Sequence, residues 1–183
     1  ALGGESCPIG KVSVDLTKED ISSVSQHLKI LLVEDNQFNR DLAKIILKKD
    51  GHLITEAATG LEALEVLTAG DFDVILMDIQ MPEMDGITAT KIIRQAEEEK
   101  PIETREYRQL AKNLQKILQG GHIPIIAMTG HAMAEDRQMC LDAGMDDYVT
   151  KPYNPKNLTA VLTRTQRMHR RAVIQGYPIT KEC

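Results

Sequence analysis

The segment Ile30-Leu31-Leu32-Val33-Glu34-Asp35 is a short apolar run followed by two carboxylates. Three more segments have the same form, namely Val74–Met77 before Asp78, Ile125–Met128 before Thr129, and Tyr148-Val149 shortly before Lys151. Short apolar runs rich in β-branched residues are typical of parallel strands that are buried on both faces. The carboxyl ends of such strands form a ligand crevice. Three carboxylates, a hydroxyl and an ammonium are therefore expected to meet at one edge of a sheet.

Between these runs the pattern alternates between strand and helix, which predicts an α/β fold with a parallel sheet. Helices are marked by apolar residues at helical spacing and by glycines at their ends. The predicted strands are Lys29–Val33, Leu53–Ala57, Val74–Met77, Pro124–Met128 and Asp147–Val149. The predicted helices are Gln37–Asp50, Gly60–Ala69, Gly86–Ala96, Met133–Ala143 and Pro155–Met168.

The segment 97–122 departs from this alternation. It is highly charged, and its apolar residues Tyr107, Leu110, Leu114 and Ile117 recur at helical spacing. This pattern predicts an extra amphipathic helix over Glu103–Gln119, inserted between the third helix and the fourth strand. Two interpretations stay open: a surface excursion whose apolar stripe packs locally, or a helix for docking or dimerisation.

The domain organisation follows from these patterns. We expect residues 1–28 to form a linker or N-terminal arm, residues 29–168 to form one domain that includes the insertion, and residues 169–183 to form a frayed tail. The length of 183 residues and a hydrophobic content of 42% suit one core built from aliphatic residues, because aromatic residues make up only 3%.

The bulk composition excludes several classes of protein. A net charge of −5 gives no electrostatic case for binding nucleic acid. No apolar run approaches the roughly 20 residues that span a bilayer, and no signal-peptide pattern is present. The three cysteines (Cys7, Cys140 and Cys183) are far apart and in no CxxC motif. This cysteine usage is typical of a reducing, cytoplasmic protein rather than of a disulfide framework.

The acidic residues suit Mg²⁺, a hard cation that prefers oxygen ligands. Of the adjacent pair Glu34 and Asp35, one can ligate directly and the other through water. Asp78 can act as a ligand and as a nucleophile that forms an acyl phosphate. The metal and Lys151 would neutralise charge during phosphoryl transfer, and Thr129 could donate to a phosphoryl oxygen. Taken alone, an acidic pair at a strand end is more typical of a helix N-cap or a solvated turn, and a lysine before proline is more typical of a solvated surface charge. The interpretation therefore depends on the coincidence of four strand ends.

Four stretches together resemble the receiver domain of response regulators. Their amino-acid sequences are most similar to those of receivers in hybrid sensor histidine kinases. The four stretches are Ile30–Arg40, Leu76–Gly86, Pro124–Ala132 and Ala143–Pro152. The resemblance extends over about residues 29–167, and it implies a doubly wound, flavodoxin-like sheet of order 2-1-3-4-5.

The resemblance also implies a role for each site residue. Asp78 matches the phosphoacceptor. Asp35 matches the direct Mg²⁺ ligand, Glu34 the water-mediated ligand, and Gln80 the ligand that uses its main-chain carbonyl. Three further residues have matches: Thr129 and Lys151 match the hydroxyl and the lysine that hold the phosphoryl group, and Tyr148 matches the switch aromatic. We also hypothesise that Gln80 and His131 set the lifetime of the aspartyl phosphate, since such positions border the path of the hydrolytic water.

The function that follows is a phosphoacceptor in a two-component phosphorelay, which catalyses its own phosphorylation and dephosphorylation. The expected donor is a histidine kinase or a histidine-phosphotransfer domain, and the chain is expected to be part of a hybrid kinase. The alternative is a stand-alone, single-domain regulator that acts through protein contacts. A Mg²⁺-dependent phosphatase is disfavoured because Gln80 stands where such enzymes place a second aspartate. A degenerate interaction module is disfavoured by the full acidic set.

Overall fold

The computed structural model describes residues 27–100, 105–130 and 134–175. Five parallel strands form one sheet in the order β2-β1-β3-β4-β5, which confirms the predicted topology. The strands are β1 (Lys29–Val33), β2 (Leu53–Ala57), β3 (Val74–Asp78), β4 (Ile125–Thr129) and β5 (Asp147–Thr150). Every neighbouring pair is parallel, so each connection crosses over the sheet through a helix.

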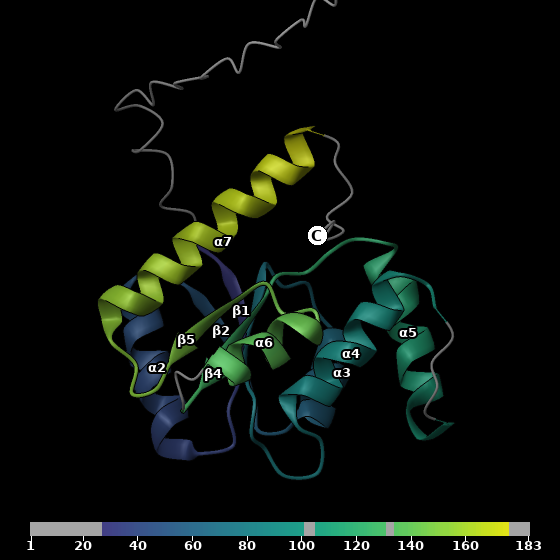
Figure 1. Ribbon diagram of the computed structural model, residues 1–183, viewed down its shortest axis with the longest axis horizontal. Coiled ribbons are helices and arrows are strands. Elements are labelled where there is room, and N and C mark those ends of the chain that lie inside the picture. Colours follow the sequence, from purple (N-terminus) through teal and green to yellow (C-terminus); the bar gives the residue numbers. More distant parts are fainter. Residues whose placement is uncertain (1–26, 101–104, 131–133, 176–183) are drawn as a thin grey trace, which may run out of the picture.

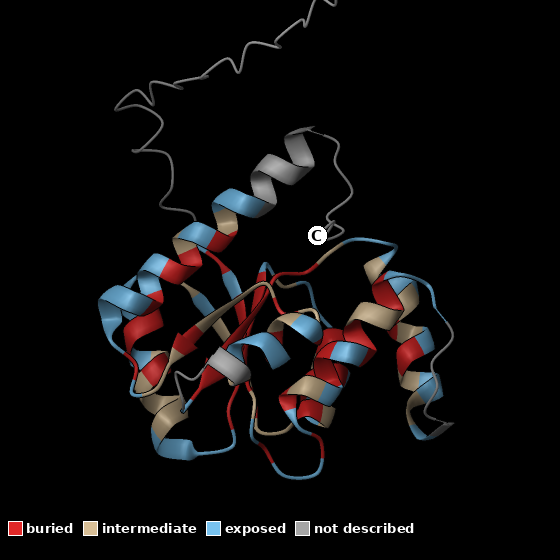
Figure 2. Cartoon of the chain, in the orientation of Figure 1, coloured by how far each residue is buried: buried red, intermediate tan, exposed pale blue. Residues whose placement is uncertain are grey.

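Helices cover both faces of this sheet (Figure 1). On one face lie α2 (Gln37–Lys49) and α7 (Pro155–Gln175), and on the other lie α3 (Gly60–Leu67), α4 (Gly86–Glu97) and α6 (Ala134–Asp142). Side chains alternate between the two layers along each strand, as the pleat requires. Leu31 and Val33 of β1 belong to the core beneath α3 and α4, whereas Ile30 and Leu32 belong to the core beneath α2 and α7. Strand β3 is consequently buried along its length, and β1 is buried from Ile30 onward (Figure 2).

The helix starts are stabilised by local side-chain caps. Asn36 Oδ1 accepts hydrogen bonds from the backbone amides at the start of α2, Thr59 Oγ1 accepts from Glu62 N at the start of α3, and Asp85 Oδ1 accepts from Thr88 N at the start of α4. These caps satisfy amides that have no partner within the helix. They also fix the loops after β1, β2 and β3.

The insertion forms a short 3₁₀ turn, η1 (Arg105–Tyr107), followed by α5 (Arg108–Leu118). The helix is therefore confirmed, although its regular part begins later than predicted. It packs on α4 and α3 as an outer layer, with Ala111 and Leu114 fully buried. Ile117, at 41% exposed, is the large apolar side chain of α5 that stays at the surface. This packing agrees with the first interpretation of the insertion, in which the apolar stripe is used within the domain.

The C-terminal helix differs from the expectation. α7 continues to Gln175, so residues 169–175 are helical, where we expected a frayed tail. The expected arm at residues 1–28 lies outside the described residues except for His27 and Leu28, and Leu28 is buried in the core. None of the described helices combines the length and the apolar character needed to cross a membrane.

Candidate functional site

The four predicted strand ends lie side by side at the carboxyl edge of the sheet. Asp78 is the last residue of β3 and Thr129 is the last residue of β4, the next strand in the sheet. Glu34 and Asp35 follow β1 on the other side of β3. Lys151 follows β5, and its backbone amide donates to the carbonyl of Thr129 at 2.7 Å. The sheet order alone thus brings residues from distant parts of the chain to one edge.

Lys151 lies between two carboxylates. Its Nζ is 2.6 Å from Asp78 Oδ2 and 2.6 Å from Glu34 Oε2. Both acidic side chains are buried, at 6% and 0% exposed, so this ion pair is poorly screened by solvent. Burial raises the pKa of Asp78, and the charge of Glu34 raises it further, although the hydrogen bond from Lys151 opposes both effects.

Glu34 has the opposite shift. Burial alone would raise its pKa, but hydrogen bonds from Lys151, Tyr153 and Asn39 together lower it. Tyr153 donates its hydroxyl to Glu34 Oε2 at 2.6 Å, and Asn39 donates its amide to Oε1 at 3.0 Å. Glu34 is therefore held as a carboxylate within the buried part of the site.

Neither of these two partners of Glu34 was identified from the sequence. From the sequence we interpreted Asn36 and Asn39 as caps of the first predicted helix, Gln37–Asp50, and as solvated polar residues. Asn36 does cap α2, whereas Asn39 reaches Glu34. Tyr153 lies two residues after Lys151, across the cis peptide bond of Pro152, and this proximity was the available signal.

The three carboxylates can share a cation. Oxygen atoms of Glu34, Asp35 and Asp78 all lie within 4.8 Å of one another. Asp35 is exposed, so its carboxylate is open to solvent beside the two buried acids. The backbone amide of Gln80 lies 3.4 Å from Asp78 Oδ1, which brings the main chain of Gln80 to the same place. This donor set consists of hard oxygens and therefore fits Mg²⁺.

Gly86 permits the close approach of the loop after β3. Its amide donates to the carbonyl of Ile79 at 3.0 Å, and a Cβ at this position would lie well below the van der Waals contact distance from the Asp78 carbonyl oxygen. Met81 and Met84 of the same loop are buried. The loop is thereby held against the backbone of Asp78.

The remaining predicted residues surround this centre. Thr129 is buried, and a Cβ on the adjacent Gly130 would meet no atom of the described residues within 4 Å. Tyr148 is half-buried against the core formed by α3 and α4, and the guanidinium of Arg137 lies 5.3 Å from the centre of its ring. His131 lies outside the described residues.

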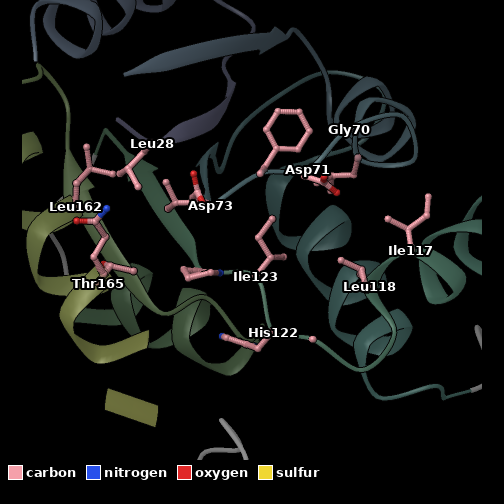
Figure 3. Close-up of a pocket in the computed structure, with 16 residues that line it drawn as sticks. Leu28, Gly70, Asp71, Asp73, Ile117, Leu118, His122, Ile123, Leu162 and Thr165 are labelled. Carbon is pink, nitrogen blue, oxygen red and sulfur yellow. The ribbon is translucent and has the colours of Figure 1, made fainter. Parts of the chain in front are cut away.

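A separate cavity of about 310 Å³ lies at the amino edge of the sheet (Figure 3). Its walls include Leu28 before β1, Asp73 before β3, and Ile123 before β4, together with Ile117 from the insertion. The hydroxyl of Thr165 in this wall has no hydrogen-bond partner among the described residues. None of the described site residues lines this cavity, so it is separate from the acidic cluster at the opposite edge.

Comparisons with known proteins agree with this geometry. The family model of the response regulator receiver domain matches residues 30–104 and 108–163. A probable histidine kinase of Oryza sativa subsp. indica is 42% identical over 155 residues, which cover 79% of this chain and 16% of that protein. A hybrid signal transduction histidine kinase of Dictyostelium discoideum is 44% identical over 139 residues, covering 73% and 7%. The chain thus spans less than a fifth of either relative.

Two solved structures are similar over most of the chain. One is the receiver domain of a sensor histidine kinase from Pseudomonas aeruginosa, with a magnesium ion coordinated in its active site cleft. It has a TM-score of 0.59 and 33% identity, covering 78% of this chain and 99% of that one. The other is a complex from Saccharomyces cerevisiae between a histidine phosphotransfer signalling protein and the receiver domain of its downstream response regulator. It has a TM-score of 0.63 and 30% identity, covering 78% and 90%.

Proposed function

Because this chain belongs to the response regulator receiver family, we propose that Asp78 is the residue that accepts the phosphoryl group. The observation that supports this assignment best is the pairing of Asp78 Oδ2 with Lys151 Nζ at 2.6 Å, beside the carboxylates of Glu34 and Asp35. A buried carboxylate with a cation and further oxygen ligands around it is suited to attack phosphorus, because the charge of the transferring group is neutralised there.

The transfer itself needs few groups. A carboxylate oxygen of Asp78 attacks the phosphorus of a phosphohistidine, the P–N bond breaks, and the imidazole nitrogen keeps the electron pair and later takes a proton. Lys151 pairs with a phosphoryl oxygen, and the hydroxyl of Thr129 donates to another once the group is attached. Tyr148 then turns inward as Thr129 moves, which shifts the domain between two conformations.

We propose that the acidic cluster binds Mg²⁺. Asp35, Asp78 and the main-chain carbonyl of Gln80 would hold the ion directly, and Glu34 would hold it through water. When bound, the ion supplies positive charge to the phosphoryl oxygens. The spacing of the three carboxylates and the exposure of Asp35 support this assignment.

The proposed donor is a histidine kinase or a histidine-phosphotransfer domain. Phe38, in the first turn of α2 close to Asp35, is 77% exposed, and Ile45 of the same helix is 67% exposed. Exposed apolar side chains on a helix that begins beside the acidic cluster suit contact with a helical donor. We further propose that the chain is the receiver of a hybrid sensor histidine kinase, supported by the two kinase relatives; a stand-alone regulator is the alternative.

Two finer parts of this proposal concern other residues. Gln80 and His131 would set the lifetime of the aspartyl phosphate, and identical decay rates after exchange of each residue would dismiss that role.

A reducing compartment such as the cytoplasm is supported by Cys140, a buried free thiol whose pKa is raised by burial.

Intact-mass spectrometry tests the central assignment. The protein is incubated with Mg²⁺ and acetyl phosphate, beside an Asp78→Asn variant and beside a known receiver as a positive control. We expect one phosphoryl gain in the wild type and none in the variant. A wild type that stays unmodified while the positive control reacts would contradict the proposal and favour an interaction module.

A further inference from the structure

The carboxylate of Glu34 is fully buried, and one of its oxygens has two donors. Lys151 Nζ and Tyr153 OH each lie 2.6 Å from Oε2, whereas Oε1 accepts from Asn39 at 3.0 Å. The negative charge of Glu34 is thus balanced by the ammonium of Lys151. The neutral hydroxyl of Tyr153 donates a second hydrogen bond to the same oxygen, Oε2.

Lys151 Nζ also forms an ion pair with Asp78 Oδ2 at 2.6 Å. In the function proposed above, its ammonium must turn to an oxygen of the phosphoryl group on Asp78. The contact with Glu34 is then weakened or lost. A buried carboxylate that loses its partner is destabilised strongly, so Glu34 would resist the movement of Lys151.

Tyr153 is placed to reduce this resistance. Its ring is 6% exposed and belongs to the core between the sheet and the two helices α2 and α7, so its position does not depend on Lys151. A tyrosine phenol is protonated at neutral pH, so the hydroxyl that contacts Glu34 is a donor. The hydrogen bond to Oε2 therefore persists after the ammonium leaves.

We propose that Tyr153 is a positioning residue: its hydroxyl holds the buried Glu34 carboxylate while Lys151 turns from Glu34 to the phosphoryl group on Asp78. This inference rests on the proposed phosphoacceptor function. A positioning role and a packing role of Tyr153 predict different results. In a positioning role, removing the hydroxyl slows phosphorylation only while Glu34 is charged; in a packing role, the effect does not depend on that charge.

The test is a double-mutant cycle on the rate of phosphorylation by acetyl phosphate at saturating donor and Mg²⁺. It compares the wild type, Tyr153→Phe, Glu34→Gln and the double variant; Tyr107→Phe removes a hydroxyl in the insertion as the matched control. We expect Tyr153→Phe to slow the reaction about tenfold, the factor typical of a lost hydrogen bond to a charged group. In the Glu34→Gln background the same change should matter less than about twofold, since a neutral amide does not retain the ammonium.

A second measurement covers the case in which Glu34→Gln is itself unreactive. The ammonium resonance of Lys151 is followed by NMR during titration with beryllofluoride, a mimic of the phosphoryl group. We expect Tyr153→Phe to need about tenfold more beryllofluoride for the same shift. The Mg²⁺ dissociation constant, measured by calorimetry, should change less than about twofold, because Asp35 and Asp78 are intact.

The outcomes separate this inference from the function on which it depends. A wild type that gains no phosphoryl group overturns the proposed function. With a reactive wild type, equal factors for Tyr153→Phe in both backgrounds would show a packing role and overturn the inference. A large loss of Mg²⁺ affinity in Tyr153→Phe would overturn it as well, because Tyr153 would then act through the metal site. If Glu34→Gln is unreactive, an unchanged beryllofluoride titration overturns it.

Discussion

At the scale of single residues, two carboxylates that contact the same ammonium have opposite pKa shifts. Burial raises the pKa of both residues. Around Asp78 the hydrogen bond from Lys151 does not offset burial and the charge of Glu34, so its pKa is raised. Around Glu34 the hydrogen bonds from three side-chain donors more than offset burial, so its pKa is lowered. Pairs of acids with such different environments are typical of sites where each acid has its own role. The difference fits Asp78 as the reacting group and Glu34 as a permanent anion beside Lys151.

Gly86 leads to a prediction at the same scale. We expect Gly86→Ala to lower the free energy of unfolding by about 2 kcal/mol or more and to reduce phosphorylation, because the new methyl group pushes the loop away from the backbone of Asp78. Chemical denaturation and the mass assay measure the two effects. Gly70→Ala is the control, since its methyl group would meet Phe72 at an ordinary distance of 3.4 Å. Equal stability of the two variants would contradict the prediction.

At the scale of elements, a buried charge cluster joins the amino edge of the sheet to α4. Arg94 of α4 donates to both oxygens of Glu97 at 2.7 and 2.8 Å, to Asp146 at 2.8 Å and to the carbonyl of Gly144 at 2.8 Å. His122 contacts the same two acids, Glu97 at 3.1 Å and Asp146 at 2.8 Å. The cluster thereby connects the end of α4 with the segments that lead into β4 and β5.

Removing the guanidinium should therefore destabilise the domain. We expect Arg94→Met to lower the free energy of unfolding by about 3 kcal/mol, because two mostly buried carboxylates lose their main cation. Lys91→Met, on the exposed side of the same helix, should change it by less than about 0.5 kcal/mol. Urea denaturation of both variants measures the difference, and similar values for the two would show that the cluster adds no stability.

The same cluster predicts a pH dependence. Burial alone would lower the pKa of His122, but hydrogen bonds to Asp146 and Glu97 raise it above its usual value, against the opposing charge of Arg94. A histidine whose pKa is raised on folding adds stability below its unfolded pKa, and this stability is lost as the pH rises through the folded value. The destabilisation by His122→Gln should thus be larger at about pH 5.5 than at about pH 8.5. Denaturation at both pH values tests this, and a larger effect at the higher pH would reverse the assigned sign.

At the scale of the whole molecule, the two edges of the sheet are used differently. The carboxyl edge holds the acidic cluster and Lys151, and the amino edge holds the charge cluster, the cavity and the end of the insertion. The insertion covers α4 and α3 on the outside of the domain. The charge cluster and the insertion are consequently separated from the acidic cluster by the length of the strands.

This separation can be tested with the insertion. We expect Leu114→Ala to lower the free energy of unfolding by about 2–4 kcal/mol, because Leu114 is fully buried between α5 and the helices beneath it. The rate of phosphorylation should stay unchanged, since the acidic cluster lies at the carboxyl edge. Ile117→Ala, at a side chain 41% exposed, should cost less than about 1 kcal/mol. A fall in the phosphorylation rate of the folded Leu114→Ala protein would show that the insertion and the site are coupled.

The sequence predicted much of this arrangement through local chemistry. The apolar runs before Glu34, Asp78 and Thr129 identified three central strands, because a strand buried on both faces has no polar positions. Helix ends were less well predicted. α7 extends beyond its predicted end at Met168, since no glycine or proline interrupts the chain until Gly176. The predicted start of the inserted helix, Glu103, was also too early, because α5 begins at Arg108 after a 3₁₀ turn. The charged residues before Arg108 are compatible with a helix, but they do not mark where its first turn begins.

What the sequence by itself determined is the periodicity of the elements and the residue type at each strand end, because both depend on neighbours along the chain. The identity of the partners of each charged group was decided only by the tertiary structure. The hydrogen bond of Tyr153 to Glu34 joins residues 119 positions apart, and that of Lys151 to Asp78 joins residues 73 positions apart. No local pattern encodes such pairs. They form because parallel crossovers bring the ends of β1, β3 and β5 to one edge, where burial removes water and leaves each charge to the side chains beside it.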